Sequence, residues 1–288
     1  MYRVGVDLGG TNIAVGVIDE NLQIVGRGKK KTNCPRAAEL IMDDIAAAVR
    51  MAVEDAGITL DDVKSIGIGT PGSVNKSNGY IEFANNLDFD QVPAKEMLEA
   101  KLDGKTVYLD NDANCAALGE AVAGCGKGVK NFVAITLGTG VGSGIILDGK
   151  IVSGINYAAG ELGHMVICVD GEQCNCGRRG CWERYASATA LIAQTKDAMR
   201  RGDATAEKVV ANYIYYLSEG IINIINALQP EIICVGGGIG HEGETLLVPV
   251  RKYVNRGRYS IHASQQTAIV SAELGNDAGI YGAALLDE

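Results

Sequence analysis

One histidine and three cysteines stand close together near the middle of the chain. His164 is followed by Cys174, Cys176 and Cys181, with glycines between the last two. Neutral imidazole and thiolates are ligands that Zn²⁺ prefers, and a set of four closes a tetrahedral site. Ordinary buried cysteines are the alternative, since a free cysteine is often buried. The close spacing favours a structural zinc site formed by these residues.

Two carboxylates, Glu161 and Glu183, flank the same segment. The set of one histidine and three cysteines is complete without them, so they are badly placed to be zinc ligands. A closed zinc site with two spare acids beside it indicates a metal that shapes a binding site and does not take part in the chemistry.

Three glycine-rich turns each follow a strand-like run and are candidate phosphate sites. Glycine lets backbone N–H groups approach an anion closely, so such turns can hold phosphates. Any one turn alone can be an ordinary connection, but two at duplicated positions favour a nucleotide. None fits the Walker A pattern or the dinucleotide fingerprint. The residues concerned are Gly9, Gly10, Thr11, Gly138, Thr139, Gly140, Gly142, Gly237 and Gly238.

Two aspartates stand at the ends of strand-like runs. Asp7 precedes the first glycine turn, where the second copy of the motif has Thr136. A carboxylate beside phosphate-binding turns would repel a nucleotide unless a cation lay between them, so we expect Asp7 to hold Mg²⁺ through water. Asp112 lies between a strand-like and a helix-like run. It is either a helix N-cap, a frequent use of aspartate, or an acid at a sheet edge that opens into a cleft.

The elements that must position these residues occur in two copies. Residues 4–19 and 133–148 both read as strand, glycine turn and strand, and each continues into a third short strand. Such paired runs are antiparallel hairpins, and a repeat of this length indicates two domains of related build. Helical patterns cover 35–57, 206–228 and 276–286. The predicted class is therefore α/β, with sheets covered by helices.

The composition excludes several classes of protein. Of 288 residues, 47% are hydrophobic and 21% are charged, as in soluble globular proteins. No apolar run approaches the ~18 residues that span a bilayer, and the first residues show no signal-peptide pattern. A net charge of −9 argues against nucleic acid as the main partner. Eight cysteines without a signal peptide indicate the cytoplasm, where thiols stay reduced.

Together these motifs resemble the ROK family of sugar kinases and sugar-responsive repressors. The resemblance covers essentially the whole chain and is greatest to bacterial ATP-dependent glucokinases. It implies an actin-like ATPase (ribonuclease H-like) fold, in which two α/β domains around a cleft close on ATP and a hexose. The motifs are Asp-x-Gly-Gly-Thr at 7–11, Gly-Thr-Pro-Gly at 69–72, Asn-Asp-Ala-Asn at 111–114, Leu-Gly-Thr-Gly-Val-Gly at 137–142, Glu-x-Gly-His at 161–164, Cys-x-Cys-Gly-x-x-Gly-Cys-x-Glu at 174–183 and Gly-Gly-Gly at 236–238.

The resemblance also implies domains, residue roles and cofactors. We expect a smaller domain of residues 1–113 plus 275–288, closed by the C-terminal helix, and a larger one of 114–274 with the zinc-containing sugar loop. Asp112 would be the catalytic base for phosphorylation of glucose at its 6-hydroxyl. ATP, Mg²⁺ and structural Zn²⁺ would be bound, and the protein would be a homodimer. The implied sugar contacts are Gly72, Asn86, Asn111, Asp112, Glu161, His164 and Glu183.

The chain departs from the family pattern at two positions expected near the sugar. Phe89 is the nearest aromatic residue where the family often has tryptophan, and Trp182 stands where an aliphatic residue is usual. Kinases of N-acetylmannosamine, N-acetylglucosamine or fructose therefore remain alternatives. A sugar-sensing repressor is disfavoured because the chain starts at its first strand, with no helix-turn-helix, and is acidic. A structural actin-like protein would have no use for the sugar loop.

Overall fold

The computed structural model describes residues 1–202 and 205–287, which form two compact units. Unit 1 comprises Met1–Gly128, Ile151–Ala159 and Asn276–Glu288, and unit 2 comprises Val129–Lys150 and Gly160–Gly275. The division assigns residues 114–128 and 151–159 to unit 1 and residue 275 to unit 2, whereas the sequence-based boundaries assigned each of them to the other domain.

Helix packing explains the difference at residues 114–128. Helix α3 (Asp112–Val122) lies against helix α9 (Ala278–Ala284) in unit 1. The contact is so close that a Cβ on Gly119 would lie 2.1 Å from the carbonyl oxygen of Ala278. The helix that begins at Asp112 therefore belongs to the first unit, with the strand that precedes it.

Both units are built on five-stranded sheets of the same plan. The strand order is β3-β2-β1-β4-β8 in one sheet and β11-β10-β9-β12-β13 in the other. In each sheet the first strand of the hairpin pairs antiparallel with the second and parallel with a later strand. The predicted duplication and the α/β class are confirmed. The strands are β1 (Tyr2–Leu8), β2 (Asn12–Ile18), β3 (Ile24–Lys31), β4 (Val63–Thr70), β8 (Val107–Asn111), β9 (Phe132–Leu137), β10 (Val141–Leu147), β11 (Lys150–Ile151), β12 (Ile232–Gly236) and β13 (Ala268–Ser271).

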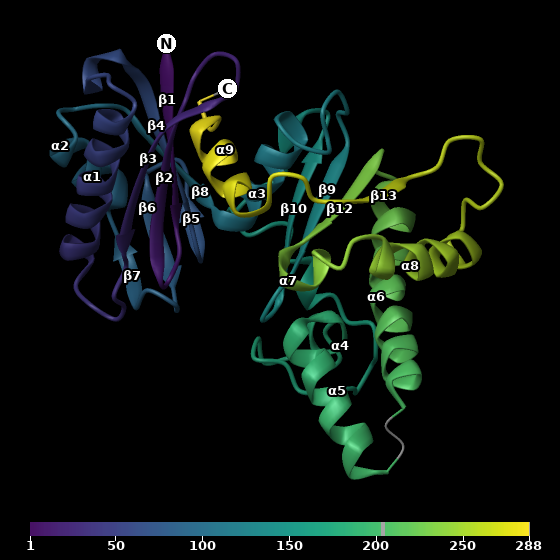
Figure 1. The fold of residues 1–288 in the computed structure, drawn as a ribbon. Coiled ribbons are helices and arrows are strands. Elements are labelled where there is room, and N and C mark those ends of the chain that lie inside the picture. Colours follow the sequence, from purple (N-terminus) through teal and green to yellow (C-terminus); the bar gives the residue numbers. More distant parts are fainter. Residues whose placement is uncertain (203–204, 288) are drawn as a thin grey trace. The chain divides into compact units, whose positions relative to one another are not determined.

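Side chains that alternate in direction along β1 show which residues lie on each face of the first sheet. Val4, Val6 and Leu8 are buried in the core that also contains the apolar residues of α1 (Ala38–Asp55). Gly5 faces the other way, because successive residues of a strand point to opposite faces. A Cβ on Gly5 would lie 1.9 Å from a carbonyl oxygen of α9, so glycine is required for this helix to pack on the sheet (Figure 1). Asp7 shares the face of Gly5.

A small antiparallel sheet completes unit 1, with the short helix α2 (Ala94–Lys101) beside it. Its strands are β5 (Ser73–Asn75), β6 (Tyr80–Ala84) and β7 (Phe89–Val92). Phe89 is only 2% exposed and packs in the core of this unit. The aromatic residue that was expected near the sugar is therefore a core residue.

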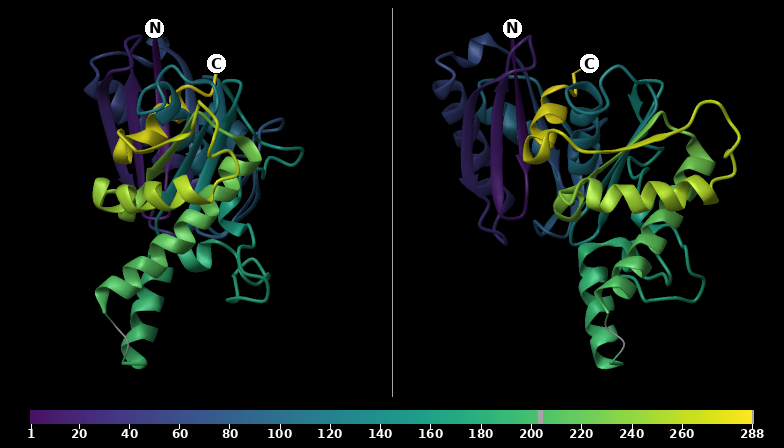
Figure 2. Two further views of the ribbon diagram at one scale, coloured as in Figure 1. Left: turned by 90° about the vertical axis from the view of Figure 1, so that its right-hand side faces the viewer. Right: turned by 45° about the vertical axis from the view of Figure 1, so that its right-hand side comes forward.

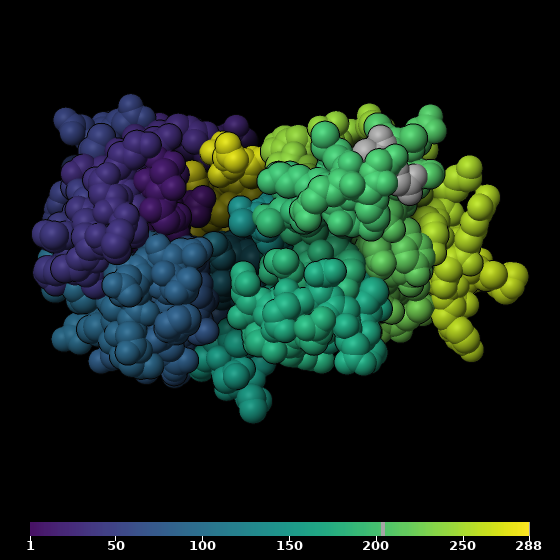
Figure 3. All heavy atoms as spheres, turned by 90° about the horizontal axis from the view of Figure 1, so that it is seen from below, coloured from purple at the N-terminus to yellow at the C-terminus, as the bar shows by residue number. Residues whose placement is uncertain are grey.

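Unit 2 contains several long helices in addition to its sheet. Helix α6 (Ala206–Leu228) has the bounds that its apolar periodicity predicted, and α5 (Ala188–Arg200) runs beside it in both views of Figure 2. Helix α8 (Glu244–Gly257) packs against α6. The segment after α8 projects from the surface in Figure 3, where Tyr259 is 91% exposed.

The remaining helical elements are short. Within the described residues, no helix is both long and apolar enough to cross a membrane. The short elements are η1 (Leu60–Asp62), η2 (Leu162–His164), α4 (Glu183–Ala186), α7 (Gly237–Gly240) and η3 (Gly275–Asp277).

Candidate functional site

The first glycine turn connects β1 to β2 in unit 1. The N–H of Gly9 donates to the carbonyl oxygen of Asn12 at 2.9 Å, which closes the turn. Thr32, which follows β3, stabilises the turn, because its hydroxyl donates to the Gly9 carbonyl oxygen at 2.6 Å. A Cβ on Gly10 would lie 3.5 Å from the carbonyl oxygen of Asn86, so the structure brings this predicted sugar contact beside the turn. Thr11 is exposed.

Asp7 and Asp112 lie near one another in unit 1. Burial, followed by the charge of Asp112, raises the pKa of Asp7 from 3.8 to about 6. Burial also raises the pKa of Asp112, and the N–H of Ala113 partly offsets this effect. Two neighbouring carboxylates that are largely buried repel one another when both are ionised. A bound cation or a proton on one of them relieves this repulsion. This pair can therefore hold a divalent cation or accept a proton.

The N-terminus of α3 is capped by Asn111 and not by Asp112. The side-chain oxygen of Asn111 accepts from the N–H groups of Ala113 at 2.9 Å and Asn114 at 3.4 Å. Its amide donates to the carbonyl oxygen of Gly72 at 3.1 Å, which brings two predicted sugar contacts together. Asp112 Oδ1 accepts from the N–H of the adjacent Ala113 at 2.8 Å. The interpretation of Asp112 as the N-cap is thus wrong.

Asp110 anchors this helix start, and the sequence analysis assigned it no role. Its Oδ1 accepts from the backbone N–H of Asn111 at 2.7 Å and from the side chain of Asn114 at 3.0 Å. Lys76 forms an ion pair with the same carboxylate, which is 1% exposed. The motif at 110–114 contains the two polar partners, but no local signal identifies Lys76, which comes from a distant loop.

The second glycine turn lies between β9 and β10 in unit 2. The N–H of Gly138 donates to the carbonyl oxygen of Gly140 at 3.0 Å, and exposed Thr139 lies between them. Gly142 continues the turn into β10. Gly237, at the end of β12, packs on the same strand end, because a Cβ there would lie 2.6 Å from the Leu137 nitrogen. The structure therefore brings the 138–142 and 236–238 turns together.

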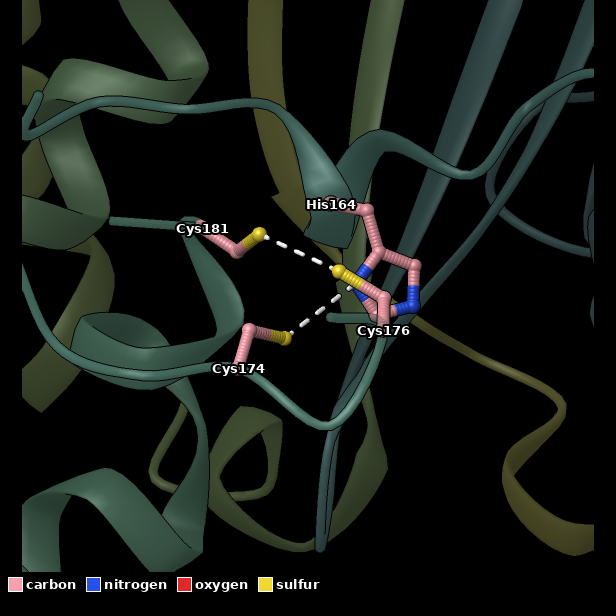
Figure 4. Close-up of side chains that lie close together, drawn as sticks. All are labelled: His164, Cys174, Cys176 and Cys181. Carbon is pink, nitrogen blue, oxygen red and sulfur yellow. Dashed lines mark hydrogen bonds between the residues drawn. The ribbon is translucent and has the colours of Figure 1, made fainter. Parts of the chain in front are cut away.

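The four predicted metal ligands converge in unit 2, as Figure 4 shows. Their ligand atoms all lie within 4.8 Å of one another. His164 Nδ1 is 3.6 Å from Cys174 Sγ, and Cys176 Sγ is 3.6 Å from Cys181 Sγ. Tetrahedral zinc with Zn–S bonds of about 2.3 Å separates its sulfurs by roughly 3.8 Å. The donor types and spacing fit such an ion.

The thiol chemistry of this cluster also suits a metal. Burial, followed by the neighbouring cysteines, raises the pKa of Cys181 to about 12, whereas the N–H of Arg178 lowers that of Cys176. A bound cation would displace the thiol proton, so metal affinity should rise with pH. The second ring nitrogen of His164 points away from the sulfurs in Figure 4 and remains for another partner.

Backbone pairing holds the ligands in place. Val166 forms a bridge with Cys181, and the N–H of Trp182 donates to the Met165 carbonyl oxygen at 2.8 Å. Trp182 is fully buried against Gly220 of α6, and its indole N–H donates to the Tyr216 carbonyl oxygen at 2.9 Å. Trp182, which departs from the family pattern, is therefore a core residue that packs the loop against α6.

The two acids that flank the cluster have different surroundings. Glu161 is exposed immediately before η2. Glu183 begins α4, and its Oε2 accepts from the N–H of Val141 at 3.0 Å. Sequence spacing gave no sign that this carboxylate reaches the glycine turn.

Comparison with known proteins identifies relatives along the whole chain. A family model described as "ROK family" matches residues 3–288. A glucokinase of Streptomyces coelicolor is 36% identical over 98% of this chain and 96% of its own length. An N-acetyl-D-glucosamine kinase of Photobacterium profundum is 32% identical over 98% of both chains.

Solved structures share the fold as well as the sequence. The crystal structure of a ROK family glucokinase from Streptomyces griseus, in complex with glucose and AMPPNP, has a TM-score of 0.81 and 35% identity over 99% of both chains. A ROK hexokinase from Thermus thermophilus has a TM-score of 0.86 and 30% identity. The prediction of an actin-like ATPase fold is confirmed by these matches.

Proposed function

Because the chain belongs to the ROK family, we propose that it is an ATP-dependent glucokinase, which transfers the γ-phosphoryl group of ATP to the 6-hydroxyl of glucose. The observation that carries the proposal is the near-complete alignment with glucokinases, one of which binds glucose and AMPPNP in its crystal structure. The products are glucose 6-phosphate and ADP.

Asp112 is the proposed general base. It accepts the proton of the 6-hydroxyl as the hydroxyl oxygen attacks phosphorus. Its position supports this role, because the side chain of Asn111, and not that of Asp112, caps α3. The ion pair of Lys76 with Asp110 fixes the start of the helix and thereby the direction of this carboxylate.

The nucleotide is assigned to Asp7 and the glycine turns. Asp7 would hold Mg²⁺, which offsets charge on the phosphates when it is bound. Backbone N–H groups of the turns would orient the phosphate oxygens for in-line transfer. The residues proposed for nucleotide binding are Asp7, Gly9, Gly10, Thr11, Gly138, Thr139, Gly140, Gly142, Gly237 and Gly238.

The sugar contacts are proposed from the family resemblance. They include Asn111, joined to Gly72, and Asn86 beside the first turn. Glu161, His164 and Glu183 are the other proposed contacts. Zinc held by His164 and the three cysteines would have a structural role, since it would orient the imidazole and stiffen the loop.

A coupled ADP-release assay with Mg-ATP tests the proposal. Glucose should give the highest kcat/KM among glucose, mannose, fructose, N-acetylglucosamine and N-acetylmannosamine. Preference for an N-acetyl sugar would instead assign the chain to the N-acetylhexosamine kinases, which include the 32% identical relative. Absence of turnover on every sugar would refute a kinase and favour a sugar-binding regulator.

The variant Asp112→Asn tests the catalytic role separately. Its kcat should fall by roughly 10²–10⁴, the usual worth of general-base catalysis, while glucose affinity stays near that of the wild type. Asp90→Asn, the same change at an exposed strand residue, is the control and should leave kcat unaltered. A kcat of Asp112→Asn close to that of the wild type would remove Asp112 from this role.

The proposal also includes a cytoplasmic homodimer. This expectation comes from the family resemblance and the cysteine content, and light scattering of the purified protein tests the oligomeric state. A molar mass near 30.2 kDa would contradict the dimer, because that is the mass of one chain.

A further inference from the structure

Glu183 joins the cysteine-containing loop to the second glycine turn, both within unit 2. Its Oε2 accepts from the backbone N–H of Val141 at 3.0 Å. Gly140 leaves room for the carboxylate, because a Cβ at that position would lie 2.1 Å from the same Oε2. The carboxylate thus lies against two consecutive residues of the turn. Its contact with the turn is an arrangement that the sugar-binding role does not require.

Further contacts fix the same turn to the same stretch of chain. The N–H of Ala188, at the start of α5, donates to the Gly138 carbonyl oxygen at 2.8 Å. On the other side, Gly163 packs so close to Val141 that a Cβ would lie 2.3 Å from its carbonyl oxygen. The turn is therefore enclosed by residues that lie before and after the cysteines.

Ser143 supplies another link just beyond the turn. Its hydroxyl donates to the Gly160 carbonyl oxygen and accepts from the N–H of Leu162, the latter at 3.1 Å. The backbone on either side of Glu161 is thus hydrogen-bonded to strand β10, the strand that follows the turn. Among all these links, the Glu183 carboxylate is a side chain that can be changed without altering the backbone.

We propose that Glu183 is a positioning residue for the phosphate-binding turn, in addition to its proposed contact with the sugar. This inference rests on the proposed function, since it assumes that residues 138–142 bind nucleotide phosphates. Val141 is 5% exposed in the intact protein, and its N–H has the Glu183 carboxylate as an acceptor. A buried N–H without an acceptor is unfavourable, and a glycine-containing turn can relax to find another. The turn would then present its N–H groups in a different direction.

This role requires a side chain that is long enough to bring an acceptor oxygen to the N–H of Val141. Glutamine keeps an acceptor oxygen at the same distance from the backbone and removes the charge. Aspartate keeps the charge and shortens the side chain by one methylene, and alanine removes the acceptor. If Glu183 acts through the turn, glutamine should preserve nucleotide binding, whereas alanine and aspartate should weaken it.

Calorimetric titration with Mg-AMPPNP in the absence of sugar tests the inference. For Glu183→Ala and Glu183→Asp we expect the AMPPNP Kd to rise about tenfold, equivalent to about 1.4 kcal/mol. Glu183→Gln should bind AMPPNP as the wild type does. Glu172→Ala, which removes an exposed carboxylate of the same loop, is the matched control and should also bind as the wild type does.

Several results would overturn the inference. If Glu183→Ala binds AMPPNP normally and only the glucose KM rises, the residue acts solely on the sugar. If Glu183→Gln is as weak as Glu183→Ala while Glu183→Asp is normal, charge and not reach is what matters. Circular dichroism establishes that each variant is folded, and the aspartate variant serves if the alanine variant is not. Failure of the wild type to bind AMPPNP would refute the nucleotide site itself, and with it the proposed function.

Discussion

Replacing Asp7 by asparagine should stabilise the protein more at neutral pH than at acidic pH. Burial and the charge of Asp112 raise the pKa of Asp7 from 3.8 to about 6. The folded state therefore holds the Asp7 proton more tightly than the unfolded chain does. The stability that this proton contributes is complete below pH 3.8 and is lost as pH rises through about 6. Asparagine has no proton to lose over this range.

The magnitude follows from the two pKa values. Since one pKa unit corresponds to ~1.4 kcal/mol, the shift from 3.8 to about 6 gives a cost of about 3 kcal/mol for ionised Asp7 at pH 7.5. At pH 4.5 the Asp7 carboxyl is already largely ionised in the unfolded chain but still protonated in the folded one. The burial of Asp7 therefore lowers the stability by about 1 kcal/mol at this pH. The stability of Asp7→Asn relative to the wild type should thus be about 2 kcal/mol greater at pH 7.5 than at pH 4.5. Any constant effect of the buried amide cancels in this difference.

Urea unfolding followed by circular dichroism measures the difference, in buffer without Mg²⁺ or nucleotide. A cation has to be absent because it would itself lower the pKa of Asp7. The control is Asp90→Asn, the same chemical change at an exposed position of β7, which should have an equal effect at both pH values. If Asp7→Asn also has an equal effect at both, burial and the Asp112 charge do not control the ionisation of Asp7. The variant should in addition lose its Mg²⁺-dependent turnover.

Two further predictions concern the cysteine cluster and the C-terminus. Elemental analysis should find zinc in the wild type and in Cys34→Ser but not in Cys176→Ser. Hydrogen exchange in residues 161–183 should be faster in Cys176→Ser, and a fully active wild type without zinc would contradict this. Asp287→Ala should destabilise the protein by about 2–3 kcal/mol, because the charged carboxylate accepts from Arg3 at 2.8 Å and Ser65 at 3.0 Å and is 3% exposed. Urea unfolding tests it against Asp90→Ala, and equal stabilities of the two variants would refute it.

The cysteine cluster shows how far local spacing can predict a site. Cys174, Cys176 and Cys181 lie within one short loop, and Gly177 and Gly180, both with positive φ, turn the chain so that the thiols converge. The position of His164 relative to them depends on the bridge between Val166 and Cys181. The sequence motif contains the metal-ligand residue types, and backbone pairing in the folded chain brings their side chains together.

The start of α3 shows where spacing fails. Asn111 and Asp112 are both good N-cap residues and adjacent in sequence, so propensity alone cannot choose between them. The choice depends on the Asn111 amide, which also donates to the Gly72 carbonyl oxygen from another part of the chain. That second hydrogen bond makes Asn111 the cap and leaves Asp112 available.

The sequence by itself determined the α/β class, the duplicated hairpins, the bounds of α6 and the residue types of the candidate site. These features depend on apolar periodicity, turn residues and short motifs, which are local properties of the chain. Only the tertiary structure decided that Trp182 is buried under α6, that Glu183 accepts from Val141 and that Asp7 is held in little water beside Asp112. Hydrogen-bond partners and desolvation depend on segments that are distant in sequence, and packing alone brings those segments together.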